Sequence, residues 1–189
     1  LMPPGAAAQP VLVDDEAAVA RLLDLVAERL GLMPQAAAAK WLSGAPIADP
    51  VREQAVLDRE AAAAQAMGLA PLPVREFFAL QIRFARELQL QLHGDWRRSG
   101  CAPCASPTDL AALRAEIDRI DLALLHALYV ARPATAREDF VERHRALATA
   151  RLGSVVALPA DRDRLLSTLH GLGTSQAPGL ARVLASGIL

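Results

Sequence analysis

The chain has 189 residues, of which 53% are hydrophobic and only 4% aromatic, and its formal net charge is −1. Ala and Leu dominate the hydrophobic set, and both favour helices, so the composition predicts an all-α fold. A net charge near zero argues against a nucleic-acid-binding protein. Charged residues make up 22% of the chain and no apolar run is long enough for a membrane span, so we expect no membrane-spanning segment.

The N-terminal segment, residues 1–13, is expected to be a disordered leader or a remnant of processing or cloning. It has neither the charged start nor the long apolar stretch of an intact signal peptide. Residues 14–189 show no internal repeat, no alternating strand pattern and no low-complexity linker. They therefore predict one domain, a single helical bundle.

Apolar residues recur at helical spacing along most of the chain, and capping residues mark the helix ends. Asp49 followed by Pro50, for example, is typical of an N-cap and a first helical residue. Pro133 is expected to break the helix that contains it. The expected helices cover about 14–30, 34–41, 49–67, 73–96, 110 up to Pro133, 135–152, 160–171 and 177–187.

The only two cysteines, Cys101 and Cys104, lie in a loop at 99–107 that is rich in Gly, Pro and Ser. A zinc site would need a second cysteine pair or suitably spaced histidines, and a thioredoxin-like motif would follow a strand. We therefore expect no metal site, and interpret the pair as a possible loop disulfide or as two unreactive thiols.

Several polar residues interrupt faces that should be apolar. Arg29 and Arg114 lie on or beside buried stripes, and Gln81 and Gln89 lie two turns apart on the 73–96 helix. Among 20 lysine and arginine residues, Lys40 is the only lysine. Singly, each has a structural explanation, such as an ion pair, a satisfied core amide or a helix-end lysine. Together the two arginines, the lysine and one inward amide, Gln89, predict a small cationic pocket for a compact ligand with more than one carboxylate.

Six segments then show a resemblance to a known family. In order and spacing they are similar to the secreted, gamma-subclass all-helical chorismate mutases, over residues 14–120. The rest of the chain, 121–189, matches in helical pattern alone. The segments are Ala27–Leu30, Lys40–Trp41, Pro46–Glu53, Phe77–Ile82, Asp95–Trp96 and Leu113–Asp118.

This resemblance implies an isomerase that converts chorismate to prephenate without a cofactor, within aromatic amino acid biosynthesis and the shikimate pathway. Family members of this kind are exported, so a periplasmic or secreted protein is expected. They act as homodimers in which each active site lies within one protomer. We expect chorismate as the partner of the site, with neither nucleic acid nor membrane as a partner.

The same resemblance implies the catalytic roles. Arg29 and Arg114 are expected to hold the two carboxylates of chorismate, and Lys40 and Gln89 to donate to its ether oxygen. Some relatives carry a glutamate where this chain has Gln89, and an amide can donate without first being protonated.

Four further positions are expected to bind substrate. Glu53 and the backbone near Arg52 would bind the ring hydroxyl, the Arg52 side chain would extend the cationic wall, and Asp49 would cap the helix that carries both. Ala85 replaces a small hydroxyl residue that touches a carboxylate in many relatives, so one contact is expected to be absent or replaced.

Two alternatives remain open at this stage. The same pocket could belong to a non-catalytic helical sensor of a small dicarboxylate. Alternatively, Arg29 and Arg114 could form interhelical ion pairs in a purely structural helical adaptor. Ligand-induced stabilisation without turnover would indicate the first, and neither effect would indicate the second.

Overall fold

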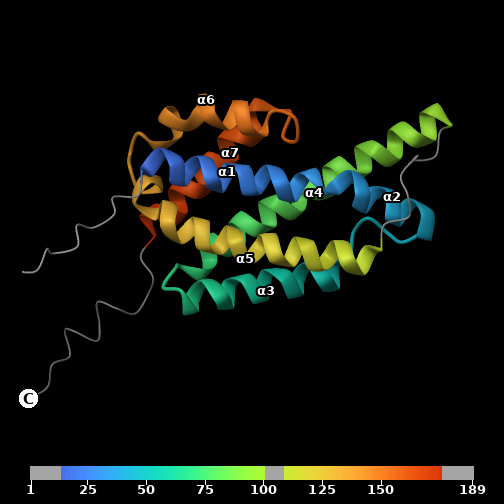
Figure 1. Ribbon diagram of the computed structural model, residues 1–189, viewed down its shortest axis with the longest axis horizontal. Coiled ribbons are helices and arrows are strands. Elements are labelled where there is room, and N and C mark those ends of the chain that lie inside the picture. Colours follow the sequence, from blue (N-terminus) through green and yellow to red (C-terminus); the bar gives the residue numbers. More distant parts are fainter. Residues whose placement is uncertain (1–13, 101–108, 176–189) are drawn as a thin grey trace, which may run out of the picture.

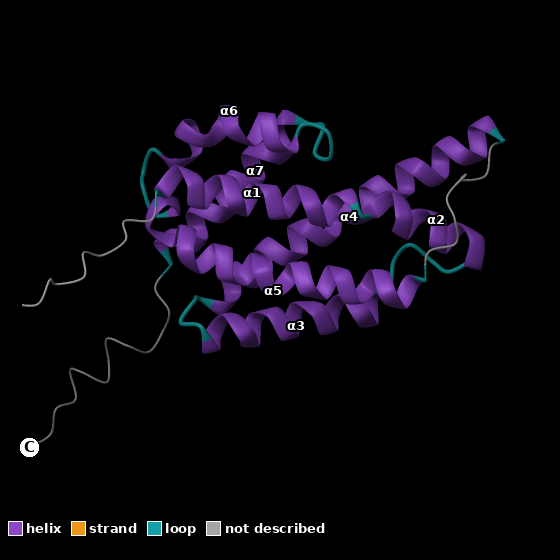
Figure 2. Ribbon diagram, in the orientation of Figure 1, coloured by secondary structure: helices purple, strands orange, loops and turns teal. Residues whose placement is uncertain are grey.

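The computed structural model describes residues 14–100 and 109–175, and these form a bundle of helices (Figure 1). No strand occurs within these ranges (Figure 2), which confirms the all-α prediction. The described helices are α1 (Asp15–Gly31), α2 (Met33–Ser43), α3 (Pro50–Ala66), α4 (Pro71–Ser99), α5 (Leu110–Thr135), α6 (Phe140–Leu152) and α7 (Pro159–Thr174).

An aspartate side chain caps the start of three of these helices. Asp14 accepts from the N–H of Glu16 at the start of α1, and Asp109 accepts from the N–H of Ala111 at the start of α5. Asp49 caps α3, as predicted. Each carboxylate satisfies an N–H that has no partner within its helix.

The C-terminal half differs from expectation at two points. Pro133 does not end α5, which continues to Thr135: the proline removes only its own N–H from the helical hydrogen bonds, and the N–H of Ala136 still reaches the carbonyl oxygen of Arg132. The next helix, α6, therefore begins at Phe140 rather than near residue 135. The helix expected at 177–187 and the cysteines Cys101 and Cys104 lie outside the described residues.

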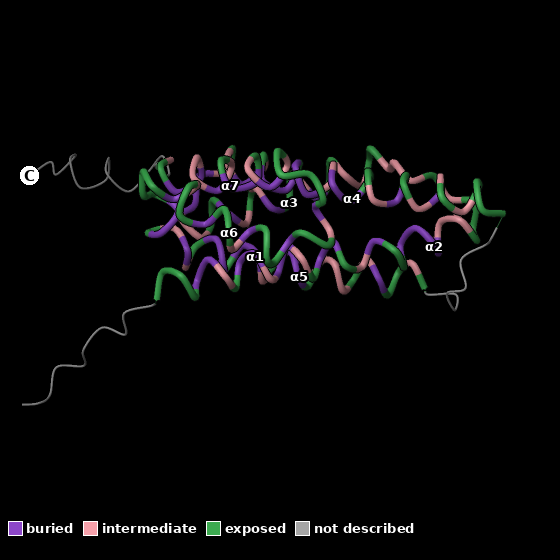
Figure 3. Tube along the Cα trace, turned by 90° about the horizontal axis from the view of Figure 1, so that it is seen from above, coloured by how far each residue is buried: buried purple, intermediate pink, exposed green. Residues whose placement is uncertain are grey.

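The core is built from leucine, alanine and a few phenylalanines. The apolar residues of α1 that recur at helical spacing are all buried: Val19, Leu22, Leu23, Val26 and Leu30. Phe77 and Phe78 of α4 and Phe140 of α6 are also fully buried. In Figure 3, buried segments face one another between α3, α4 and α7 on one side and α1 and α5 on the other. None of the described helices is both long and apolar enough to cross a membrane.

The long helix α4 reaches past the end of α1, and α2 packs beside its last turns (Figure 1). His93 of α4 is buried against α2, where its Nε2 lies 2.8 Å from the carbonyl oxygen of Ala37. The indole of Trp41 meets the His93 ring edge-on, with ring centroids 5.1 Å apart. This contact fixes α2 beside α4, so side chains of both helices can reach one space.

Candidate active site

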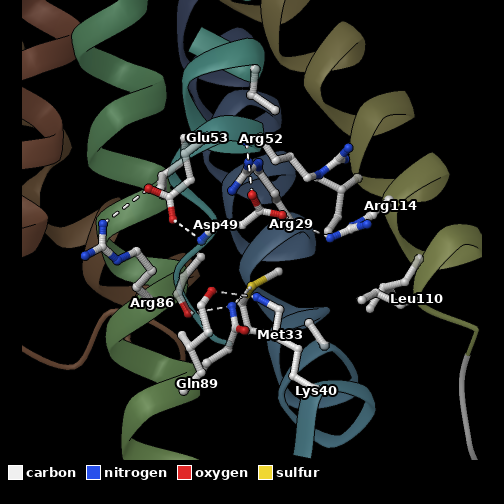
Figure 4. Close-up of a pocket in the computed structure, with 17 residues that line it drawn as sticks. Arg29, Met33, Lys40, Asp49, Arg52, Glu53, Arg86, Gln89, Leu110 and Arg114 are labelled. Carbon is white, nitrogen blue, oxygen red and sulfur yellow. Dashed lines mark hydrogen bonds and ion pairs between the residues drawn. The ribbon is translucent and has the colours of Figure 1, made fainter. Parts of the chain in front are cut away.

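One cavity of about 110 Å³ lies between α1, α2, α3, α4 and α5 (Figure 4). Every site residue expected from the sequence lines it, although those residues are distributed over 86 positions of the chain, from 29 to 114. They are Arg29, Lys40, Asp49, Arg52, Glu53, Ala85, Gln89 and Arg114. Their individual roles toward a ligand stay predictions.

Arg29 enters the cavity from the last turn of α1 and is 4% exposed. Its Nε donates to Oδ1 of Asp121 on α5 over 2.7 Å. Asp121 is fully buried, so this ion pair lies behind the cavity wall. Arg114 also pairs across helices, with Asp49 at 3.4 Å. Both arginines therefore form the interhelical ion pairs that a structural role predicts, and both also line the cavity.

Lys40 comes from the last turn of α2 and donates from Nζ to the carbonyl oxygen of Ile47 over 2.7 Å. Burial lowers the pKa of Lys40, and the charge of Arg114 lowers it further, while Asp49 and Glu53 oppose that shift. A compact ammonium with donors to spare therefore faces the cavity beside an arginine.

Gln89 lies on α4 opposite Lys40 and is 4% exposed. Its Nε2 donates to the carbonyl oxygen of Ala85 over 3.1 Å and contacts Met33 Sδ at 3.4 Å. Its Oε1 is buried, and the described residues offer it no hydrogen-bond partner. Because Ala85 has no hydroxyl, the wall beside Gln89 lacks the side-chain donor expected in many relatives.

The first turn of α3 forms another wall. Asp49 Oδ1 accepts from the N–H of Arg52 at 3.2 Å, and Glu53 Oε1 accepts from the N–H of Asp49 at 3.3 Å. These reciprocal bonds resemble a capping box and hold the Glu53 carboxylate at the rim. The positive end of the helix dipole points to the same rim and favours anions there.

The cavity is lined by five cationic and two acidic side chains, so its lining is net positive. Arg86 was missed by the sequence analysis, although it lies four residues after Ile82 and three before Gln89, which both face the cavity. Its Nη1 contacts Glu53 at 3.3 Å, and Arg52 contacts Asp118 at 3.4 Å. Both contacts are long and partly exposed, so they leave the guanidinium groups able to bind an anion.

No cluster of His, Cys, Asp or Glu in the described ranges has the arrangement of a metal site. The cationic lining instead offers donors in fixed positions, including two planar guanidinium forks on different helices. Such forks bind carboxylates through paired hydrogen bonds. The fold and cavity therefore define a class: all-helical proteins that bind a small polyanion inside the bundle.

Comparison with known proteins narrows this class. The profile of chorismate mutase type II matches residues 20–90. The chain is 30% identical over 116 residues to a secreted chorismate mutase of Mycobacterium tuberculosis, covering 61% of this chain and 58% of that protein. It is 29% identical over 142 residues to a secreted chorismate mutase of Mycolicibacterium smegmatis, covering 73% and 78%. The Mycobacterium tuberculosis match thus spans little more than half of that relative.

A solved structure covers more of the chain. The chorismate mutase of Burkholderia thailandensis superposes with a TM-score of 0.69 at 30% identity, covering 83% of this chain and 99% of that one. The chain belongs to the family of type II chorismate mutases.

Proposed function

We propose that the chain is an isomerase that rearranges chorismate to prephenate in the cavity between α1 and α5. The observation that carries the proposal is the convergence of Arg29, Lys40, Gln89 and Arg114, from four helices, on one cavity. Family membership supports the same reaction, since the relatives reported above are named chorismate mutases.

The reaction is unimolecular: one C–O bond breaks as one C–C bond forms, and no proton has to be transferred. Catalysis therefore consists largely of holding an extended dianion in its reactive, chair-like conformer. Arg29 on α1 and Arg114 on α5 would each bind one carboxylate. Because the two arginines stand on different helices, they would fix both ends of the substrate at once.

Negative charge grows on the ether oxygen as the C–O bond breaks. Lys40 and Gln89 line the cavity from α2 and α4. We assign both as donors to that oxygen, so that a preorganised ammonium and amide stabilise the transition state more than the ground state. The amide Nε2 of Gln89 would exchange its contacts with Ala85 and Met33 for the substrate.

The rim of α3 would bind the ring hydroxyl. The Glu53 carboxylate would accept from it, and the backbone near Arg52, held by the Asp49 cap, would contribute to the same subsite. The Arg52 side chain would add positive charge. Ala85 leaves one carboxylate contact unfilled, and Arg86, one residue further on, would supply charge at the same wall.

We also propose the context of this activity. Export to the periplasm or the medium is supported by the name "secreted" of the two mycobacterial relatives. A homodimer with self-contained active sites is consistent with a cavity lined by one chain. The helices share one core, which supports a single domain from residue 14 onward. The product would enter the biosynthesis of aromatic amino acids.

The direct test follows the loss of chorismate absorbance with purified protein, using Arg29→Ala as the control. We expect rapid conversion to prephenate by the parent and none by the variant.

Conversion should be level from mildly acidic to neutral pH, because Gln89 donates without titrating. It should fall on the alkaline side, below the ordinary lysine value of 10.5, as Lys40 with its lowered pKa loses its proton.

A folded parent without turnover would refute the proposal. Stabilisation of that inactive protein by small dicarboxylates would then establish the non-catalytic sensor instead.

A further inference from the structure

We propose that Asp121, itself steadied by Arg59, is a positioning residue that fixes the orientation of Arg29 in the cavity. The inference rests on the proposed function, and it assigns a role to a charged group that does not line the cavity. The evidence is a chain of ion pairs that leads from the cavity wall, through α5, to the outer side of α3.

The first link determines which edge of Arg29 meets the ligand. A guanidinium can bind a carboxylate through its Nε edge or through its two terminal nitrogens. Asp121 occupies Nε at 2.7 Å, and it is the one carboxylate in the described part of the chain that contacts Arg29. The edge formed by Nη1 and Nη2 has no protein acceptor there. Asp121 therefore leaves the Nη1 and Nη2 edge of Arg29 available to bind the substrate.

The second link holds Asp121. Its Oδ2 is buried and accepts no hydrogen bond from the described residues, but Arg59 Nη2 lies 3.6 Å away. The same Nη2 donates to Asp118 at 3.0 Å, and Arg59 Nε donates to Glu60 at 2.7 Å. Arg59 thus sits among three carboxylates and keeps Asp121 from turning away from Arg29.

The network reaches a second cavity residue. Asp118 lies one helical turn before Asp121 on α5, and it also contacts Arg52 at 3.4 Å. Arg59 therefore connects the carboxylates behind Arg29 and Arg52. Burial raises the pKa of Glu60, and the charge of Asp121 adds to that effect, while Arg59 counters it. Without Arg59, three acids would repel one another directly behind the cavity.

A purely structural role explains this arrangement less well. Burying an ion pair costs desolvation, and apolar residues of similar volume in place of both partners often give equal or greater stability. Asp121 is fully buried on α5 between Ile120 and Leu124, where the buried face otherwise consists mainly of apolar residues. What a leucine could not do is bind Nε and direct the terminal nitrogens into the cavity.

The test compares steady-state kinetics and thermal stability for two substitutions of Asp121. Asp121→Leu should lower kcat/KM by about 100-fold, since a misplaced binding group costs that much even when the reacting atoms are untouched. Asp121→Asn should recover most of that loss, to within about tenfold of the parent, because its carbonyl oxygen can still accept from Arg29 Nε. A role in packing alone would not produce this order.

Two further variants separate positioning from stability. Arg59→Gln changes a half-exposed residue that does not line the cavity, and should raise KM by about threefold. Tm should fall as well, because the buried Glu60 and Asp121 lose a cation, and the next variant is the reference for such a fall. Arg162→Met is the control for destabilisation, because Arg162 is buried and bonded to the Val156 and Ala157 carbonyls, remote from the cavity lining. It should lower Tm while kcat and KM of the folded protein stay at parental values.

The outcomes are distinct. A folded, active parent with Asp121→Leu at parental kcat/KM refutes the positioning role. A loss that Arg162→Met reproduces refutes it equally, because activity would then follow stability. If Asp121→Leu does not fold, parental kinetics in both Asp121→Asn and Arg59→Gln refute it. An inactive parent refutes the proposed function, and the positioning role with it.

Discussion

The cavity end of the bundle and the α6–α7 end both hold buried or half-buried polar side chains, but the hydrogen bonding of these side chains differs. At the α6–α7 end, His144 Nδ1 lies 2.8 Å from the Phe140 carbonyl oxygen and His170 Nδ1 lies 2.9 Å from that of Thr135. At the cavity end, Gln89 Oε1 and the terminal nitrogens of Arg29 have no protein partner in the described ranges. Polar groups aimed at backbone carbonyls serve the fold, whereas partly bonded groups around a cavity are available to a ligand.

The two ends are also connected to different parts of the chain. α6 and α7 pack on α1, α4 and α5, which also carry cavity residues. The α6–α7 end therefore supports the helices that carry the site without contributing a side chain to its lining. The comparison predicts that changes at the cavity end alter kinetics at constant stability, and that changes at the other end do the reverse.

After Arg29→Ala, the largest effect is expected at Lys40. Lys40→Ala should lower kcat by about 10²–10³-fold, or about 3–4 kcal/mol, because it removes one preorganised donor to the ether oxygen. The melting temperature should change little, since Lys40 lines a cavity rather than the apolar core. Steady-state kinetics and a thermal melt check both parts.

Lys40→Met is the matched control, because it keeps the aliphatic stem and removes only the ammonium. It should be as inactive as Lys40→Ala. A kcat within a few-fold of the parent in either variant would remove Lys40 from the mechanism. It would also contradict the expectation that changes at the cavity end alter kinetics.

A smaller effect, on stability alone, is expected where α7 crosses the end of α5. A Cβ at Gly173 would lie 2.4 Å from Thr135 Oγ1 and 2.5 Å from backbone atoms of Thr135 and Ala136. Gly173→Ala should therefore destabilise the fold by about 2 kcal/mol as the helices move apart. We expect Tm to fall by about 4–8 °C, with kcat/KM of the folded protein unchanged.

Gly171→Ala controls for helix propensity, since a Cβ there meets nothing within 4 Å. It should leave Tm unchanged or raise it slightly. Loss of kcat/KM in Gly173→Ala at temperatures where it is folded would show that the two ends are coupled more strongly than their separate hydrogen bonding suggests.

The sequence predicted only those features of the two ends that depend on neighbouring residues along the chain. Periodicity and caps gave the helices, because Asp49 before Pro50 can be recognised without knowing the fold. Asp121 was missed because it adjoins Ile120 and precedes Leu124, so it looked like the solvent edge of a stripe. Only the partner, Arg29, ninety-two positions away, makes an acid tolerable there. Pro133 misled because a proline removes only its own N–H, so the residues after it can still close the last turn of α5.

The smallest effect is expected at Gln81, and it tests the boundary between the two ends. Gln81 and Gln89 lie two turns apart on α4, and both interrupt its buried face. Gln81 is fully buried, its Nε2 and Oε1 have no hydrogen-bond partner among the described residues, and it does not line the cavity. An unsatisfied buried amide costs stability. Gln81→Met, which keeps the length of the side chain, should therefore raise the free energy of unfolding by about 1 kcal/mol at unchanged kcat/KM.

Gln91→Met, on the exposed side of the same helix, is the control and should leave both quantities unchanged. Denaturant unfolding measures the first quantity, and chorismate consumption the second. If Gln81→Met instead lowers kcat/KM, the Gln81 amide contributes to the site from behind the cavity wall. If Gln81→Met lowers stability, the Gln81 amide stabilises the fold and is not the unsatisfied group that the prediction assumes.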